Sequence, residues 1–199
     1  MGRRDPRQQY RGTVETCTVY QIKRSKASFG TIGPGSAPHV WALYFQQSID
    51  GRLQFVPYRG AAPVTRDMIA GQIDLSTLEA SNVLPHVRAG RIKGYAVLTE
   101  SRWQVASEIP TIAEAGAGTL YMPFWYGLWG PKGTSEEAIA KLNAAALAAL
   151  ADPTTRARLI ELGQKIPPPE QQTPQALAAY HKAECEKWWP ITRAAGIEP

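Results

Sequence analysis

The residues Gly33-Pro34-Gly35-Ser36-Ala37-Pro38-His39 join a short extended run, Ser28 to Ile32, to a helix with an apolar stripe. Two glycines allow a tight turn and a close approach of the backbone to a ligand. Ser36 is a good helix N-cap, and Pro38 costs no hydrogen bond in a first turn. Unpaired N–H groups and the helix dipole favour an anion at such an opening. The stretch therefore predicts a strand–loop–helix unit that binds an anion, the alternative being a turn and a cap without a ligand.

The same order of strand and helix continues along the first half of the chain. The expected strands are Ser28–Ile32, Leu53–Tyr58, Ile73–Leu78 and Ile92–Leu98, and the expected helices are Ser36–Ile49, Ala61–Ala70 and Asn82–Ala89. Gly71 and Gly90 follow the second and third helices as left-handed caps. Strands that alternate with helices over short connections indicate an α/β fold, with a parallel sheet and helices on its faces.

Three junctions between a strand and a helix follow one another, at Thr31 to His39, Tyr58 to Ala62 and Leu78 to Asn82. Ligands of parallel sheets bind beyond the carboxyl ends of the strands. If the three strands are neighbours, three helix openings meet in one electropositive patch without any buried Lys or Arg.

Side chains at these junctions add polar groups to the patch. Hydroxyl or imidazole donors are expected from Ser36, Tyr58, Ser81 and His39. Glu79 repels an anion but accepts from an ammonium or a hydroxyl, unless it is simply an exposed loop acid. A ligand that carries both a carboxylate and a donor group fits this set.

The pattern changes after Ser101. Pro110 to Glu114 contains a capping box that predicts a short helix ending at Gly116. Phe124 to Trp129 is expected to be an aromatic strand, whose side chains are typical of a core, although one that points outward can line a cleft. Further helices are expected from Thr134 to Ala151, from Asp152-Pro153 to Leu162, and from Thr173-Pro174 to about Gly196.

The net charge of +5 comes from the beginning of the chain. Residues 1–26 hold seven Lys or Arg and two acidic residues, which leaves fifteen of each sign in residues 27–199. A nucleic-acid reader carries a basic face on the folded domain, so we expect no nucleic-acid partner. No apolar run is long enough to span a membrane, and residues 1–26 lack the apolar core of a signal peptide.

Catalytic and metal-binding patterns are not apparent in the sequence. Cys17 and Cys185 are far apart and have no ligand spacing, so neither a zinc site nor a disulfide is indicated. His39, His86 and His181 are scattered, and the last two fit solvated helix faces. No nucleophile elbow, dinucleotide fingerprint or P-loop occurs. We therefore expect a non-catalytic protein without a cofactor or metal.

Several motifs resemble the solute-binding receptors of tripartite tricarboxylate transporters, the Bug (TctC) family. The matching runs are Gly35–His39, Val56–Pro63, Ala70–Leu75, Leu84–Gly90, Ile109–Thr111, Glu114–Gly116, Trp125–Thr134, Leu142-Asn143 and Ala194–Ile197. The resemblance covers about residues 26 to 199. It implies a two-lobed periplasmic-binding-protein fold (type 2) that closes on small carboxylates and works with the membrane components of a transporter.

The resemblance also implies a division of the chain. Residues 1–27 are an atypical basic segment, 28–122 resemble the complete second lobe, and 123–199 resemble the C-terminal part of the first lobe. The substrate-binding residues it implies, together with the junction residues, are Gly35, Ser36, Ala37, His39, Tyr58, Gly60, Ala61, Glu79, Ala80, Ser81 and Tyr126.

The chain departs from the family at its beginning, where a signal peptide and half of the first lobe are expected. Residues 1–25 do not resemble that part. We therefore expect a strand at Trp125 without partners, unless Thr13–Ile22 supplies one, and exposed apolar surface that favours self-association. The readings left open are a periplasmic receptor with impaired binding, a cytoplasmic sensor module, and a non-functional gene fragment.

Overall fold

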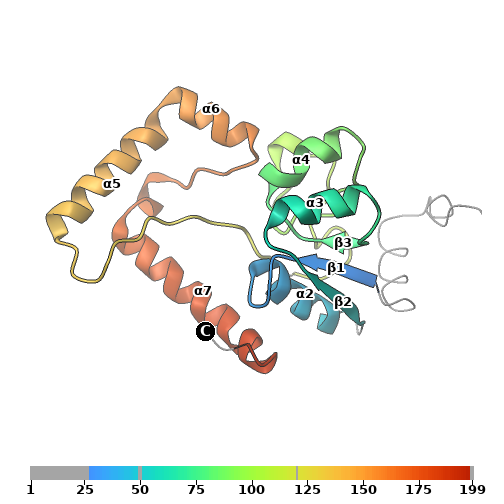
Figure 1. Cartoon of the computed structure of the whole chain (residues 1–199). Helices are drawn as coiled ribbons and strands as arrows, with labels where there is room; N and C mark the ends of the chain where they lie inside the picture. Colours follow the sequence, from blue (N-terminus) through green and yellow to red (C-terminus); the bar gives the residue numbers. More distant parts are fainter. Residues whose placement is uncertain (1–26, 49–50, 120, 198–199) are drawn as a thin grey trace, which may run out of the picture.

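A computed structural model describes residues 27–48, 51–119 and 121–197 (Figure 1). Its centre is a parallel sheet with the strand order β2-β1-β3. β1 (Ala27–Thr31) pairs along its whole length with β2 (Leu53–Pro57). On its other side β1 pairs with β3 (Leu75–Ser76), Phe29 lying opposite Leu75. The predicted α/β fold with a parallel sheet is confirmed, and β1 is its central strand.

Helices cover both faces of this sheet. α2 (Ala37–Ser48) packs on one face, and α3 (Ala61–Ile69) and α4 (Ala80–Arg88) lie on the other (Figure 1). The aromatic ring of Phe29 packs 6.2 Å from that of Trp41, which stacks on Phe45 at 4.7 Å between ring centres. These three buried side chains from β1 and α2 form the centre of the main core.

β1 and α3 approach closely at Gly30. An added Cβ at Gly30 would lie 2.6 Å from Ile73 Cδ1 and 2.8 Å from Val64 Cγ1. Val64 and Ile73 are both buried. Gly30 therefore allows α3 to pack directly against the middle strand.

Two of the predicted strands are wrong in extent. β3 begins only at Leu75, because the Asp74 carboxylate accepts from the amide and hydroxyl of Ser28, at 2.8 and 2.6 Å. Residues 92–98 do not form a strand of the sheet. Val97 makes a single bridge to Thr111, so this run pairs with a turn rather than with a neighbouring strand.

The capping box at Thr111 forms, but the helix that it was expected to begin does not. Thr111 N donates to Glu114 Oε2 at 2.8 Å, and Glu114 N donates to Thr111 Oγ1 at 3.2 Å. Residues 112–116 then make only consecutive turns. A short 3-10 helix, η2 (Gln104–Ala106), precedes them.

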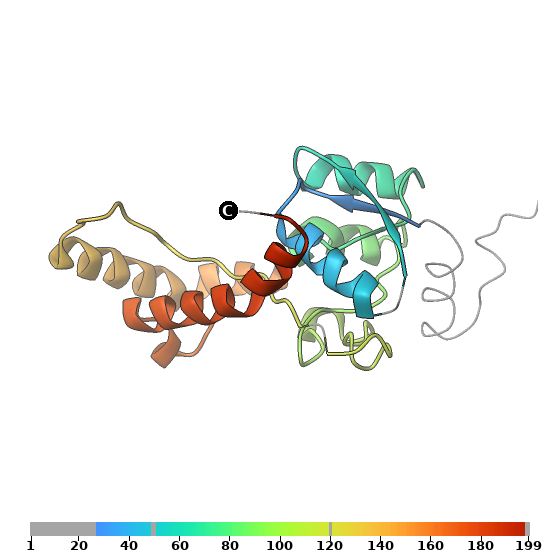
Figure 2. The same ribbon diagram turned by 90° about the horizontal axis from the view of Figure 1, so that it is seen from below.

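The C-terminal arm, residues 123–197, extends away from the sheet (Figures 1 and 2). It consists of an extended segment followed by α5 (Glu136–Ala151), α6 (Pro153–Glu161), the 3-10 helix η3 (Pro169–Gln171) and α7 (Pro174–Ala194). The predicted caps of the last two helices, Asp152 and Thr173, are confirmed. At the beginning of α5, the side chain of Ser135 rather than that of Thr134 accepts a hydrogen bond from Ala138 N.

The aromatic segment 124–129 is not a strand, which corrects the prediction. It lies along α7 instead, with Trp125 5.2 Å from Tyr180 and Trp129 4.9 Å from His181 between ring centres. Tyr126, Leu128 and Trp129 are 68%, 73% and 61% exposed. These three side chains are therefore not part of a core.

Exposed apolar surface on this part of the chain was expected and is present. α5, α6 and α7 contain no buried residue within the described part of the chain. The predicted strand Thr13–Ile22 and the basic segment up to residue 26 lie outside the described residues.

The packing at Gly30 predicts that Gly30→Val lowers the free energy of unfolding by about 1–3 kcal/mol, the cost of overpacking a core. Chemical denaturation monitored by circular dichroism measures this change. Gln54→Val on the exposed side of β2 is the matched control and should alter stability by less than about 0.5 kcal/mol. A Gly30→Val protein as stable as the parent would contradict the close packing.

Candidate functional site

The carboxyl ends of β1, β2 and β3 lie at one edge of the sheet, here called the carboxyl edge. Because β1 is paired in parallel with both neighbours, the three strands end side by side. Tyr58 N donates to Thr31 O at 2.8 Å, and Ser76 Oγ donates to Gly30 O at 2.8 Å. These bonds hold the ends together where α2, α3 and α4 begin. The strand order meets the condition set by the sequence prediction, that the three strands are neighbours.

The loop before α2 is closed by its own side chains. Gly33 and Gly35 have φ angles of 113° and 75°, which favour glycine. Ser36 Oγ donates to Gly33 O at 2.6 Å, and Gly35 N donates to His39 Nδ1 at 3.1 Å. The Gly35 amide, expected to face an anion, is thus occupied by the imidazole in this structure.

His39 is held as a neutral ring. Its Nδ1 accepts from Gly35, so the proton is on Nε2. The ring edge packs against Phe55, 4.9 Å between centres, and burial lowers the pKa of His39. His39 therefore retains one donor, Nε2–H, of the kind that the sequence predicted.

Backbone amides at the three openings are available to a ligand. Ala37 and His39 donate to no acceptor in the part of the chain that the structure describes. Within the described residues, no side chain caps α3, which begins after Gly60, or α4, which begins after Glu79. The predicted residues Ala61, Ala80 and Ser81 are the first residues of these two helices. Unsatisfied N–H groups at neighbouring helix openings are suited to an acceptor or an anion.

The hydroxyl of Tyr58 has a partner within its own unit. It donates to Asp67 Oδ2 of α3 at 2.9 Å. Burial, and then the neighbouring Asp67, raise the pKa of Tyr58, so the phenol stays neutral. The expected donation from Tyr58 to a ligand is therefore not supported.

Glu79 and Tyr126 are brought together from distant parts of the sequence. The Tyr126 hydroxyl donates to Glu79 Oε2. Loss of hydration, and then the hydrogen bond and charge of Glu79, raise the pKa of Tyr126 to about 12. The acceptor role expected of Glu79 is thus filled by a residue of the C-terminal arm, which links the arm to the carboxyl edge.

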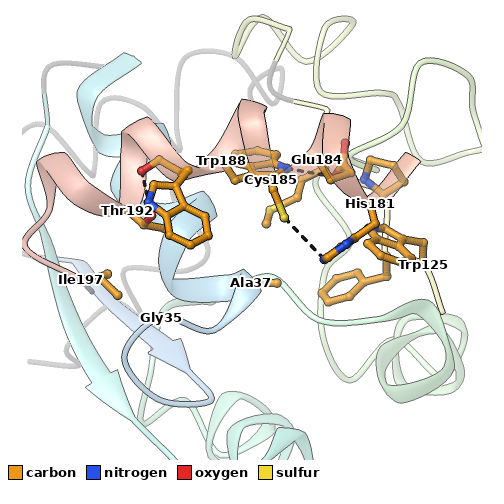
Figure 3. Close-up of a pocket in the computed structure, with 13 residues that line it drawn as sticks. Gly35, Ala37, Trp125, His181, Glu184, Cys185, Trp188, Thr192 and Ile197 are labelled. Atoms are coloured by element: carbon orange, nitrogen blue, oxygen red, sulfur yellow. Dashed lines mark hydrogen bonds between the residues drawn. The ribbon is translucent and has the colours of Figure 1, made fainter. Parts of the chain in front are cut away.

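A second feature, here called the aromatic hollow, was not predicted. It has a volume of about 490 Å³ and lies between the loop before α2, residues 122–125 and α7 (Figure 3). Gly35 and Ala37 belong both to its lining and to the opening of α2. Its other lining residues are Met122, Pro123, Phe124, Trp125, His181, Glu184, Cys185, Trp188, Trp189, Thr192 and Ile197.

The helical part of this lining has a visible sequence signal. His181, Cys185 and Trp188 are spaced by four and three residues, which places them on one face of a helix. His181 Nε2 lies 3.5 Å from Cys185 Sγ, and Trp188 Nε1 donates to Glu184 at 3.0 Å. Which surface this face meets depends on tertiary packing, so the spacing alone did not predict a hollow.

No helix among the described residues has the length and apolar composition needed to cross a membrane. Within the same residues, no three His, Cys, Asp or Glu side chains are grouped so that they could hold a metal ion.

Comparison with known proteins identifies the fold and the family. The family model described as "Tripartite tricarboxylate transporter family receptor" matches residues 7–197. The chain belongs to this family. The match begins ahead of residue 26, where the resemblance drawn from the motifs began.

Individual proteins are also similar to this chain in sequence. A UPF0065 protein from the TAR-I ttuE-ttuC' intergenic region of Agrobacterium vitis is 30% identical over 183 residues, which are 92% of this chain and 53% of the relative. The protein BugT of Bordetella pertussis is 25% identical over 178 residues, 89% of this chain and 54% of BugT. The chain thus spans about half the length of these two relatives.

Solved structures of this receptor family have the same fold. MatC of Rhodopseudomonas palustris with bound malate has a TM-score of 0.79 and 31% identity, over 86% of this chain and 57% of MatC. The periplasmic binding protein BugD has a TM-score of 0.82 and 29% identity, over 90% of this chain and 60% of BugD. The predicted periplasmic-binding-protein fold and Bug (TctC) family are confirmed. The proteins of this family are solute receptors, not enzymes.

The link between Tyr126 and Glu79 predicts that Tyr126 loses its proton at an unusually high pH. The neutral phenol is favoured in the folded state, so the link stabilises the chain below pH 10 and is lost as pH rises through about 12. Ultraviolet absorbance measured against pH reports the ionisation of tyrosines. The difference between the parent and Tyr126→Phe gives the titration of the Tyr126 phenol alone.

Glu79→Gln removes the negative charge and should lower the pKa of Tyr126 towards 10. Glu100→Gln, at another exposed glutamate, is the control and should leave the titration unchanged. A Tyr126 that titrates near 10 in the parent would exclude the link, provided that circular dichroism shows a folded chain.

Proposed function

We propose that this chain binds a small organic carboxylate at the carboxyl edge, as the ligand-binding part of a solute receptor. The observation that carries the proposal is that three neighbouring strands lead into three helices, and that among the described residues the first amides of α3 and α4 have no capping side chain. A carboxylate accepts several N–H bonds at once and is favoured by the positive ends of the helices. The bound malate of MatC supports the same class of ligand.

The division of the chain into lobes belongs to the same proposal. Residues 28–122, with the sheet and α2 to α4, correspond to one lobe, and residues 123–197 to the C-terminal part of the other. The direct contact of Tyr126 with Glu79 supports a ligand site at the boundary between the two. A receptor of this family would act in the periplasm and deliver its ligand to the membrane components of a tripartite transporter.

A sensor module that uses the same binding edge without a transporter is the alternative function. Cell fractionation with an antibody to this chain distinguishes the two. Periplasmic protein supports the receptor, and exclusively cytoplasmic protein supports the sensor.

Carboxylate binding at the α2 opening can be tested at Gly35. Its φ of 75° and the 3.3 Å separation between an added Cβ and Ile197 Cγ2 make valine strained there. We expect butanoate, hexanoate, malate or adipate to raise the melting temperature of the parent, and Gly35→Val to lose the rise. Gly133→Val places the same residue at another positive φ, in the loop before α5, and should keep the rise.

Ser36→Pro gives a second test because it removes the Ser36 amide from the same loop. A rise that survives both loop variants would locate the site elsewhere. If none of the four carboxylates shifts the melting temperature of the parent, the proposed function is wrong for this chain.

The exposed side chains of the arm lead us to propose that the isolated chain self-associates. Leu128 and Trp129 are largely exposed, and large exposed apolar patches favour association. Sedimentation velocity should show a mass that rises with concentration. The double variant Leu128→Ser, Trp129→Ser should restore the monomer, whereas Ile69→Ser on α3 should not. A parent that remains monomeric at all concentrations would exclude self-association.

A further inference from the structure

The aromatic hollow begins beside the opening of α2 and continues along α7 (Figure 3). Gly35 and Ala37 lie at its α2 side, and Trp125, His181 and Glu184 lie together at the other end. Its volume of about 490 Å³ is in the range of small-molecule sites. A ligand whose carboxylate binds at the α2 opening therefore has an adjacent space for the rest of its body.

Four polar side chains in the wall of the hollow, Trp188, Thr192, His181 and Cys185, already have contacts within α7. Trp188 Nε1 donates to Glu184 at 3.0 Å, and Thr192 Oγ1 donates to Trp189 O at 2.9 Å. His181 Nε2 is 3.5 Å from Cys185 Sγ. The remaining surface is largely aromatic and aliphatic, so it stabilises an apolar group that leaves water.

The hollow is poorly suited to a second carboxylate. No Lys or Arg of the described chain is among its lining residues. Lys187 and Arg193 contact the rings of Trp188 and Trp189, at 4.7 and 5.4 Å from the ring centres, but do not line the space. An anion that loses water without a partner is strongly disfavoured.

Glu184 adds a negative charge at the end of the hollow away from the α2 opening (Figure 3). The two ends of the hollow therefore differ in how well they bind an anion. The α2 opening offers free amides and the positive end of a helix, whereas the other end offers indole rings and a carboxylate.

We propose that the aromatic hollow holds the apolar body of the ligand, so that this chain selects a monocarboxylate with an aliphatic or aromatic body over a dicarboxylate. This inference rests on the proposed function, since it places the carboxylate at the opening of α2. It adds to that function the class of ligand.

Hexanoate and adipate form a matched pair of probes, because adipate has a second carboxylate where hexanoate has a methyl group. With the full 199-residue chain, calorimetry should show hexanoate binding at least about tenfold more tightly than adipate. Binding should also tighten about fourfold with each methylene from propionate to hexanoate.

Two variants connect this preference to the hollow. Cys185→Phe fills the space from α7 and should abolish the gain with chain length, whereas Cys185→Ser leaves the space open and should keep it. Glu184→Gln removes the repelling charge but keeps an acceptor for Trp188, and should reduce the preference for hexanoate over adipate several-fold.

Each outcome separates this inference from the proposed function. Equal or tighter binding of adipate, lost in Gly35→Val, would overturn the monocarboxylate preference and leave the carboxylate site intact. A hexanoate preference that persists unchanged in both Cys185→Phe and Glu184→Gln would show that the hollow does not hold the ligand. Absence of binding by every carboxylate would overturn both.

Discussion

The parallel pairing of β1 with a strand on each side is the constraint on which the rest of the structure depends. Parallel strands that share a register end at the same edge, so the following loops and helix openings must meet there. Gly30 makes this arrangement compact, since Val64 and Ile73 occupy the space that a side chain would need. The carboxyl edge is therefore a direct result of the topology.

Much of this edge could be predicted from the sequence because its signals are local. The bounds of α2, α3 and α4 follow from apolar spacing and from glycines with positive φ, such as Gly71 and Gly90. The family itself was recognisable from short motifs. The predictions that were wrong concern contacts between residues far apart in the sequence. Residues 92–98 are apolar enough for a strand, but whether they pair depends on Val97 meeting Thr111 across the fold.

The site was predictable only in part, for a similar reason. Sequence reasoning identified the helix openings, but not the partners of their side chains. Tyr58 donates to Asp67 nine residues later, and Tyr126 reaches Glu79 across 47 positions. The aromatic segment 124–129 has the composition of a strand, yet it packs on α7. The aromatic hollow results from that packing and is not encoded in any single motif.

The hydrogen bond from Gly35 to His39 has a consequence for the thermodynamics of recognition. The Gly35 amide is exposed, and it already has an acceptor in the imidazole of His39. Any anion that takes the Gly35 amide must displace Nδ1, so binding there is an exchange of one acceptor for another. The loop is thus already assembled, and the net gain at this amide is the difference between a charged and a neutral acceptor.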